Sequence, residues 1–185
     1  MKKVFIVHGL HGWPNGGWRV WLMGDLDKKE IYACALSLPN IDNPICRDWV
    51  EEITRQVEMN KDDEIYLVGH SLGSTAILRY LESLGTKVAG AVLVSGPIKS
   101  VENKVIENFL DKPFDFEKIK TSAKRFVVIH GDNDSRVPFE HAEILSKELG
   151  CKLVTVQNGG HLTGSEGWKT QPQVLENLID IMGLT

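Results

Sequence analysis

The chain has 185 residues, of which 42% are hydrophobic and 25% are charged, and its formal net charge is −4. These values are typical of one globular domain with its own hydrophobic core, and they exclude a disordered chain, a collagen-like fibre and a disulfide-dependent mini-protein. Because the Lys and Arg residues are scattered, we expect no nucleic-acid partner.

Short apolar runs alternate with longer amphipathic stretches along the chain, a pattern typical of a parallel sheet covered by helices. Strands that are buried on both faces need near-continuous Val, Ile and Leu. Runs of this kind predict six strands, in chain order at residues 4–7, 31–36, 65–68, 88–94, 126–129 and 153–156. The second run is marked more weakly than the others, because it contains Ala33, Cys34 and Ala35. The first run is too short for a signal sequence or a membrane span, so we expect a cytoplasmic protein with no membrane partner.

The stretches between these runs carry apolar residues every three or four positions, which predicts helices. Trp49, Ile53 and Val57 mark one such stretch, and others cover residues 76–81, 142–149 and 172–182. Pro138 suits the first turn of the helix that stops at Gly150.

Residues 97–121 interrupt this alternation, and we expect a short helix, a loop or a small cap there. The segment is short and carries several charges, whereas a large lid over a lipid-binding groove would need more residues and fewer charges. The sequence thus predicts a single α/β domain over residues 1–185, with a mainly parallel β-sheet, helices on both faces and an accessible site.

The motif G-x-S-x-G occurs at residues 69–73, directly between a predicted strand and a predicted helix. That context is typical of a nucleophile elbow, in which a serine stands in a strained turn and flanking glycines let strand and helix approach closely. Ser71 is therefore the candidate nucleophile. The alternative is an ordinary turn in which Ser71 only caps the helix.

A serine nucleophile needs a base and an orienting acid, and in this architecture they follow later strands in the order Ser, Asp or Glu, His. His161 lies on a Gly-rich loop after the last predicted strand and is the candidate base. Asp132 and Asp134 both follow the fifth strand. We favour Asp134, which stands in the loop four residues before Pro138, because Asp132 directly follows Gly131, where Asp commonly shapes a turn. Structural roles are expected for the histidines His8, His70, His130 and His141.

The Gly-rich segment 8–12 follows the first predicted strand. In this architecture that loop supplies one backbone N–H of the oxyanion hole, and the residue after the nucleophile supplies the other. Leu10 is the preferred donor in the loop, His11 is the alternative, and Leu72 is the second donor. A plain Gly-rich turn is the competing interpretation.

No cofactor or metal is expected. His8 and His11 have a loose metal-like spacing, but no third ligand is placed to complete a site. The first strand is followed neither by a P-loop ending nor by G-x-G-x-x-G, so NTPase and dinucleotide chemistry are unsupported. The cysteines Cys34, Cys46 and Cys151 are odd in number and far apart, so we expect no disulfide framework and no zinc-ligand pair among them. We expect them to pack in the core.

Large side chains near these motifs are candidates for a substrate pocket. Trp13 lies shortly after the segment 8–12, and Trp168 follows His161. Together with His11 they could line an acyl site. Ordinary packing of loops on the sheet is the alternative.

Four stretches resemble the α/β-hydrolases, and more closely the small, lid-poor serine hydrolase family that includes retinoblastoma-binding protein 9 and bacterial relatives. They are His8-Gly9 with Trp18 downstream, Leu38-Pro39-Asn40 leading to Trp49, the motif at 69–73, and the pair 134–138 and 159–161. The resemblance implies a triad of Ser71, Asp134 and His161, and the Asp-x-x-Val-Pro pattern that starts at Asp134 resembles the acid motif of the family. The chain lacks the L-x-C-x-E segment for which the retinoblastoma-binding relatives are known, so no protein partner is expected on that basis.

The sequence therefore favours hydrolysis of a small acyl substrate, with a carboxylic ester as the first choice. A thioester or an amide could be cleaved by the same triad. An alternative from another class is a degenerate hydrolase fold that serves as a protein-binding module, but a binding module has no use for all three triad residues.

Overall fold

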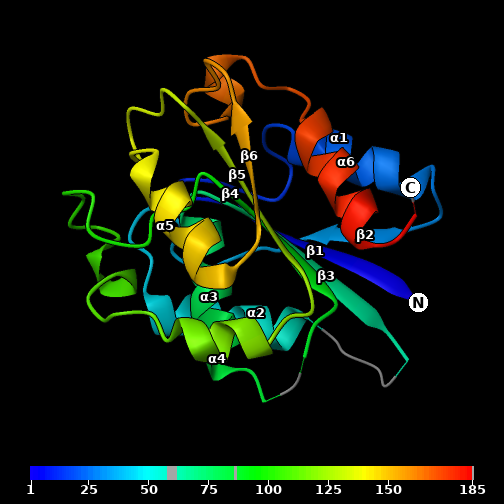
Figure 1. Ribbon diagram of the computed structural model, residues 1–185, viewed down its shortest axis with the longest axis horizontal. Helices are drawn as coiled ribbons and strands as arrows, with labels where there is room; N and C mark the ends of the chain where they lie inside the picture. The colour runs from blue at the N-terminus through cyan, green and yellow to red at the C-terminus, as the bar shows by residue number, and fades with distance from the viewer. Residues whose placement is uncertain (58–61, 86, 185) are drawn as a thin grey trace.

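The computed structural model describes residues 1–57, 62–85 and 87–184. Its centre is a six-stranded sheet in which all neighbouring strands run parallel, in the order β2-β1-β3-β4-β5-β6 (Figure 1). The strands are β1 (Lys2–Val7), β2 (Tyr32–Ala35), β3 (Glu64–His70), β4 (Gly90–Val94), β5 (Phe126–Gly131) and β6 (Lys152–Val156). All six predicted strands are present, and the predicted parallel character extends to the whole sheet.

Helices cover both faces of the sheet, as predicted (Figure 1). One face carries α1 (Arg19–Asp27) and α6 (Pro172–Ile181), and the other carries α2 (Cys46–Gln56), α3 (Leu72–Ser83), α4 (Phe116–Thr121) and α5 (Glu140–Leu149). No helix in the described part of the chain has the length and hydrophobicity that a bilayer crossing requires.

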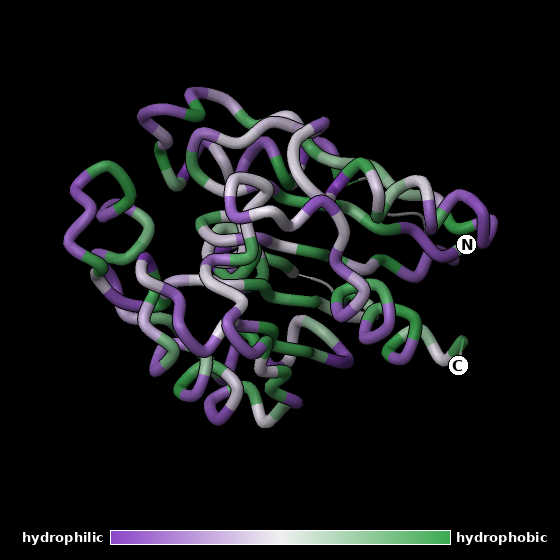
Figure 2. Tube along the Cα trace, turned by 90° about the horizontal axis from the view of Figure 1, so that it is seen from above, coloured by the Kyte–Doolittle hydropathy of each residue, from purple (hydrophilic) through white to green (hydrophobic). Residues whose placement is uncertain are grey.

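The core consists of two hydrophobic layers, one on each face of the sheet. Successive side chains of a strand point to opposite faces, so Val4 and Ile6 pack with α1 and α6, whereas Phe5 and Val7 pack with the helices of the other face. Figure 2 shows the result as hydrophobic central strands surrounded by more hydrophilic outer segments. This double burial explains why the central strands β1, β3, β4 and β5 are near-continuous apolar runs.

The strand order reverses beside β1. The chain passes from β1 outward to β2 and then returns past β1 to β3, from where it continues to β6. The carboxyl ends of β1 and β3 therefore lie where connections leave in opposite directions, which is where open α/β sheets form a binding crevice.

Residues 97–121 form a covering segment with two short helices, η1 (Glu107–Phe109) and α4. Phe109 is fully buried, and its ring centroid lies 5.4 Å from that of Trp49 on α2. Arg79 on α3 donates a hydrogen bond to the carbonyl of Phe109 at 2.9 Å. The segment thus packs on α2 and α3.

The sequence analysis did not predict α1. Only Leu22 and Leu26 form its fully buried face, and Trp18 at its start provides no side-chain hydrogen bond as a cap. Without a polar cap or a long apolar stripe, the local pattern does not stand out from the loop before it.

Candidate active site

Ser71 stands in a tight turn between β3 and α3, with φ of +55° and ψ of −126°. A residue with a Cβ rarely adopts a positive φ, so this turn is strained. A Cβ on Gly69 would lie 2.6 Å from the Cα of Ser74, and one on Gly73 would lie 2.2 Å from the carbonyl oxygen of Val7. Glycine at both positions therefore lets strand and helix pack closely and places Ser71 beside the end of β1.

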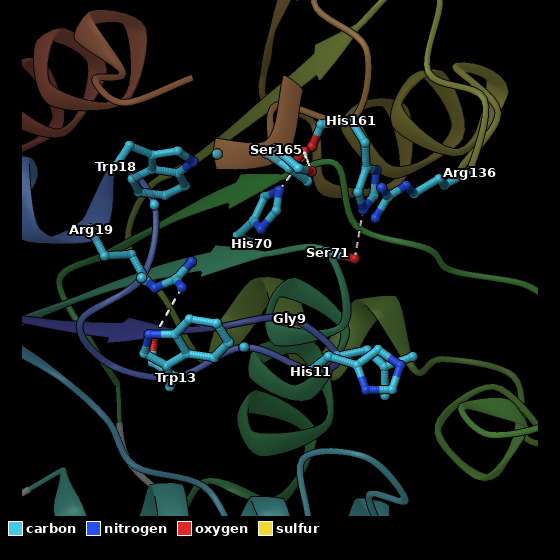
Figure 3. A pocket seen from close by; sticks show the side chains of 16 residues that line it. Gly9, His11, Trp13, Trp18, Arg19, His70, Ser71, Arg136, His161 and Ser165 are labelled. Atoms are coloured by element: carbon cyan, nitrogen blue, oxygen red, sulfur yellow. Dashed lines mark hydrogen bonds between the residues drawn. The ribbon is translucent and has the colours of Figure 1, made fainter. Parts of the chain in front are cut away.

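Ser71, His161 and Asp134 form a continuous chain of hydrogen bonds. Nε2 of His161 lies 2.8 Å from Oγ of Ser71 (Figure 3), and Nδ1 of His161 lies 2.7 Å from Oδ2 of Asp134. The three residues follow β3, β6 and β5, whose carboxyl ends share one edge of the sheet. Only 3% of His161 and 9% of Asp134 are exposed, so these two residues are shielded from water, whereas Ser71 is half-buried.

The two aspartates that follow β5 have different contacts. Asp134 faces His161, whereas Oδ1 of the exposed Asp132 accepts a hydrogen bond from the N–H of Asn158 at 2.7 Å. Asp132 thus ties the loop after β5 to the loop after β6, and Asp134 is the aspartate that contacts the imidazole.

The surroundings of Asp134 keep its carboxylate ionised. Oδ1 accepts two backbone N–H groups at 2.8 and 3.0 Å. Burial alone would raise the pKa of this carboxyl, but hydrogen bonds from His130 and His161 outweigh burial and hold the pKa well below its usual range. An ionised Asp134 accepts a hydrogen bond from the protonated Nδ1 of His161. The other ring nitrogen, Nε2, is then free to accept a hydrogen bond from the hydroxyl of Ser71.

The loop after β1 packs directly against the serine turn. A Cβ on Gly9 would lie 2.9 Å from the Cβ of Ser71. The N–H of His11 is engaged, because it donates to a backbone carbonyl of the neighbouring loop at 3.0 Å. Among the described residues, the backbone N–H groups of Leu10 and Leu72 donate no hydrogen bond. Leu72 is the first residue of α3, so its N–H has no acceptor within the helix. The two donors predicted for an oxyanion are therefore both unengaged.

A model of the serine hydrolase family matches residues 4–180. The chain belongs to this family. It is 35% identical to YdeN of Bacillus subtilis over 180 residues, which cover 96% of this chain and 94% of YdeN. It is 25% identical to the serine hydrolase RBBP9 of Rattus norvegicus over 169 residues, 89% of each protein. The family resemblance inferred from the motifs is thereby confirmed.

Solved structures of other proteins have the same fold as this serine hydrolase. The crystal structure of the ydeN gene product matches with a TM-score of 0.93 at 34% identity, over 99% of this chain and all 100% of that one. Polyneuridine aldehyde esterase shares the fold with a TM-score of 0.70 at 16% identity, over 98% of this chain and 100% of that one. The predicted α/β-hydrolase fold class is confirmed.

In this serine hydrolase, side chains from other segments hold the loop that carries His161. Six of them bind backbone groups of residues 158–162 at distances of 2.7–3.1 Å. Three bonds run from backbone N–H groups to side-chain oxygens: Asn158 to Asp132, Gly160 to Asn133, and His161 to Glu166. Three more run from side-chain N–H groups to backbone carbonyls: Trp168 to Gly159, His70 to His161, and Trp18 to Leu162. These bonds fix the backbone from which the imidazole projects.

Trp168 is predicted to line a substrate pocket, but the structure places it elsewhere. It belongs to the walls of neither cavity beside Ser71. Its indole N–H donates to the carbonyl of Gly159 at 2.8 Å, and its ring packs against the core layer of α1 and α6. Its contacts therefore support the loop of His161.

Glu166 is a residue that the sequence analysis missed. Its Oε1 accepts the N–H of His161 at 3.1 Å, and its Oε2 accepts the N–H and the hydroxyl of Thr163 at 3.0 and 2.7 Å. Thr163 and Glu166 form a capping box around η2 (Gly164–Glu166). The spacing T-x-x-E directly after the histidine is the sequence signal that could have revealed it.

Two cavities flank Ser71 and His161. The first, of about 340 Å³, is walled by the loop after β1, including His11 and Trp13, and by residues 163–165. The second, of about 330 Å³, lies under the covering segment, and its apolar lining residues include Leu72, Pro97, Val101, Ile106 and Val137. Two of the three predicted pocket residues thus line the first cavity.

Three of the other buried histidines are neutral and hold backbone. Burial lowers the pKa of His8, of His70 to about 3 and of His141 to about 4. Nδ1 of His141 accepts the N–H of Ile98 at 3.1 Å, which requires the neutral ring. His130 differs, because its Nε2 lies 3.3 Å from Oδ2 of Asp134 and so helps to form the surroundings of that carboxylate.

No group of three His, Cys, Asp or Glu side chains within residues 1–57, 62–85 and 87–184 is arranged as metal ligands. The thiols are free and half-buried, and burial raises the pKa of Cys46 and of Cys151 to about 11. These two thiols are therefore poor nucleophiles at neutral pH.

Proposed function

We propose that this serine hydrolase cleaves carboxylic esters of small acyl groups, with Ser71 as nucleophile, His161 as base and Asp134 as the acid that orients it. The observation that carries the proposal is the chain of hydrogen bonds from Ser71 through His161 to Asp134, at 2.8 and 2.7 Å. The strained turn at Ser71 fits a nucleophile elbow.

In the first half of the proposed reaction, Oγ of Ser71 attacks the ester carbonyl carbon while Nε2 of His161 takes the hydroxyl proton. Asp134 keeps Nδ1 protonated and stabilises the imidazolium. The N–H groups of Leu10 and Leu72 donate to the oxyanion. The ester C–O bond then breaks, His161 gives its proton to the departing alcohol, and the acyl group stays on Ser71.

In the second half, a water molecule attacks the acyl group, and His161 takes a proton from that water. The bond from the acyl carbon to Oγ of Ser71 breaks, and His161 returns the proton to Oγ as the carboxylic acid leaves. One ester and one water thus give one acid and one alcohol. Every proton passes through His161, so the proposed reaction uses no cofactor or metal.

The cavities support a small substrate. Their volumes of about 340 and 330 Å³ lie at the lower end of the range for small-molecule sites, and both meet at Ser71. One can take the acyl group and the other the alcohol. Because a solved structure with the same fold is an esterase, esters are the first substrates to test.

The proposal is tested with p-nitrophenyl esters of increasing acyl length. We expect kcat/KM to be highest for short chains and to show no jump at a lipid–water interface. Ser71→Ala should remove the activity, whereas Ser146→Ala, a matched change on α5 outside both cavities, should retain it. Retention of more than about a tenth of the activity in Ser71→Ala would overturn the nucleophile assignment.

Thioesters and amides with the same acyl groups belong in the same screen. A higher kcat/KM on either class would move the reaction from ester hydrolysis to that class without changing the triad. A fluorophosphonate probe tests the alternative of a binding module, since it labels only an activated serine. Absence of labelling in folded protein would favour the binding module.

A further inference from the structure

Arg19, the first residue of α1, is a buried cation in the wall of a cavity that the proposed nucleophile also lines. Only 7% of the residue is exposed, and it lines the first cavity together with Ser71 and His161. Figure 3 shows the guanidinium directed from α1 into this cavity, between Trp13 and His70.

The hydrogen-bonding capacity of this guanidinium is mostly unused. Nη2 donates to the carbonyl of Trp13 at 3.0 Å, and Nε is buried without an acceptor. Across the part of the chain that the structure describes, Nη1 forms no hydrogen bond and no carboxylate forms an ion pair with Arg19. Burial lowers the pKa of Arg19 to about 10, so the group keeps its charge at neutral pH.

The imidazoles of His70 and His8 near Arg19 are neutral, and the preceding loop approaches the guanidinium closely. His70 and His8 have pKa values lowered by burial and by the charge of Arg19. A Cβ on Gly16 would lie 2.6 Å from Nη2, so the loop before α1 closes tightly around the guanidinium. The other imidazole of this loop, that of His11, is paired with Asp42 at 2.7 Å.

A cation without a counter-ion in such a place destabilises the free protein, and an aliphatic side chain could fill the same volume. A buried charge is, however, a strong binding group for an anion, and the guanidinium is well suited to a carboxylate. The unpaired donors of Arg19 therefore point to an anionic group on the molecule that enters this cavity.

We propose that Arg19 binds a carboxylate of the substrate, so that this hydrolase prefers esters that carry a second, ionised carboxyl group. The inference rests on the proposed function, because it places the ester at Ser71 in the same cavity. The carboxylate can belong to the acyl half or to the alcohol half of the ester, and the experiment distinguishes the two.

The first test compares esters that differ only by a carboxylate in place of a methyl group. Monoethyl glutarate against ethyl pentanoate tests the acyl half, and the butanoate ester of 3-hydroxypropanoate against propyl butanoate tests the alcohol half. We expect the ratio of kcat/KM, charged over neutral, to exceed one for the wild type in one pair. Ratios below one in both pairs would overturn the proposal whatever the variants do.

Arg19→Met keeps the length and apolar volume of the side chain and removes the charge. It should lower the ratio about tenfold or more, mainly through KM, and Arg19→Lys should retain part of it. Lys124→Met removes a charge from an exposed residue just before β5, at the opposite edge of the sheet, and should leave the ratio unchanged. If Arg136→Met, at the exposed arginine that lines both cavities, abolishes the preference and Arg19→Met does not, the assignment to Arg19 is wrong.

A binding measurement separates this inference from the proposed function. Calorimetry should detect binding of the favoured charged ester to Ser71→Ala protein, which cannot cleave it. The double variant with Arg19→Met should bind the same ester about tenfold more weakly. Melting temperatures check that both proteins are folded. If the wild type cleaves no ester but this binding depends on Arg19, the proposed function fails and the carboxylate site stands. If the wild type cleaves esters and Arg19→Met alters neither ratio nor binding, the carboxylate site fails and the proposed function stands.

Discussion

Asp132 and Asp134 stand two positions apart and have different environments. Asp134 is buried with a depressed pKa against His161, whereas Asp132 is exposed and binds a backbone N–H of the next loop. The sequence could rank them, because one directly follows the strand and the other lies further into the loop. It could not give the contact with His161, which depends on how the loops after β5 and β6 meet.

Asp134→Asn should lower kcat by roughly 10⁴-fold, because an amide no longer holds the proton on Nδ1 of His161. The amide oxygen can still accept the two backbone N–H groups on Oδ1, so the fold should persist. Asp132→Asn should keep kcat and lose about 1 kcal/mol of stability. Measuring kcat and melting temperature for both variants decides the matter, and an inactive but stable Asp132→Asn would reverse the assignment.

Glu166→Ala should lower kcat about tenfold with little change in KM, because the loop of His161 loses the carboxylate that binds its N–H. Glu166→Gln should recover part of the rate, since its amide oxygen still accepts a hydrogen bond. Glu176→Ala, on the exposed side of α6, serves as the control. A rise in KM at unchanged kcat would contradict a positioning role.

At the scale of elements, the strands and four of the helices were predictable, whereas α1 and the shape of the covering segment were not. Burial on both faces gives the four central strands a strong local signature, whereas the edge strands β2 and β6 are only partly buried. The covering segment owes its shape to distant partners, such as Trp49 against Phe109 and Arg79 at the Phe109 carbonyl. Neither contact has a local signature, and α1 likewise lacks a polar cap.

Gly73→Ala should destabilise the protein by about 3 kcal/mol, because the new Cβ would lie 2.2 Å from the backbone oxygen of Val7, which cannot move without shifting β1. Gly24→Ala in α1 is the matched control, since its Cβ would meet nothing within 4 Å. That change should stabilise the protein by up to about 1 kcal/mol. Urea unfolding measures both, and equal stabilities would contradict the close packing of α3 on β1.

At the scale of the whole molecule, the parallel sheet brings distant segments to one edge. The sequence could predict Ser71, Asp134 and His161 as the triad, because each of them follows a predicted strand and the carboxyl ends of parallel strands lie at one edge of the sheet. Several segments that are distant in the sequence together form the two cavities and hold the His161 loop. Arg19 lines the first of these cavities. Such features depend on the assembled fold, which explains why Trp168 is a support of the loop rather than a pocket wall.

Stability should fall as the pH drops below about 6.5. In the unfolded chain an imidazole titrates near that value, whereas burial lowers the pKa of His141 to about 4 and of His70 to about 3. Between about pH 6.5 and 4 the unfolded chain therefore binds more protons than the folded chain, so each histidine removes up to about 1.4 kcal/mol per pH unit as the pH falls.

Urea unfolding at a series of pH values measures this slope. In His141→Gln the slope should be smaller by the contribution of one group, because the amide oxygen can accept the N–H of Ile98 without titrating. A wild-type stability that stays constant from pH 7 to 5 would show that these histidines are not held neutral.

The most direct test of the central claim is to identify the acylated residue during turnover. The wild type and Ser71→Ala are mixed with p-nitrophenyl butanoate, quenched in acid within the first turnover and analysed by peptide mass spectrometry. The proposed mechanism predicts one butanoyl group on the peptide that contains Ser71 in the wild type and none in the variant. An acyl group on any other residue, or rapid hydrolysis with no acyl-enzyme in either protein, would contradict it.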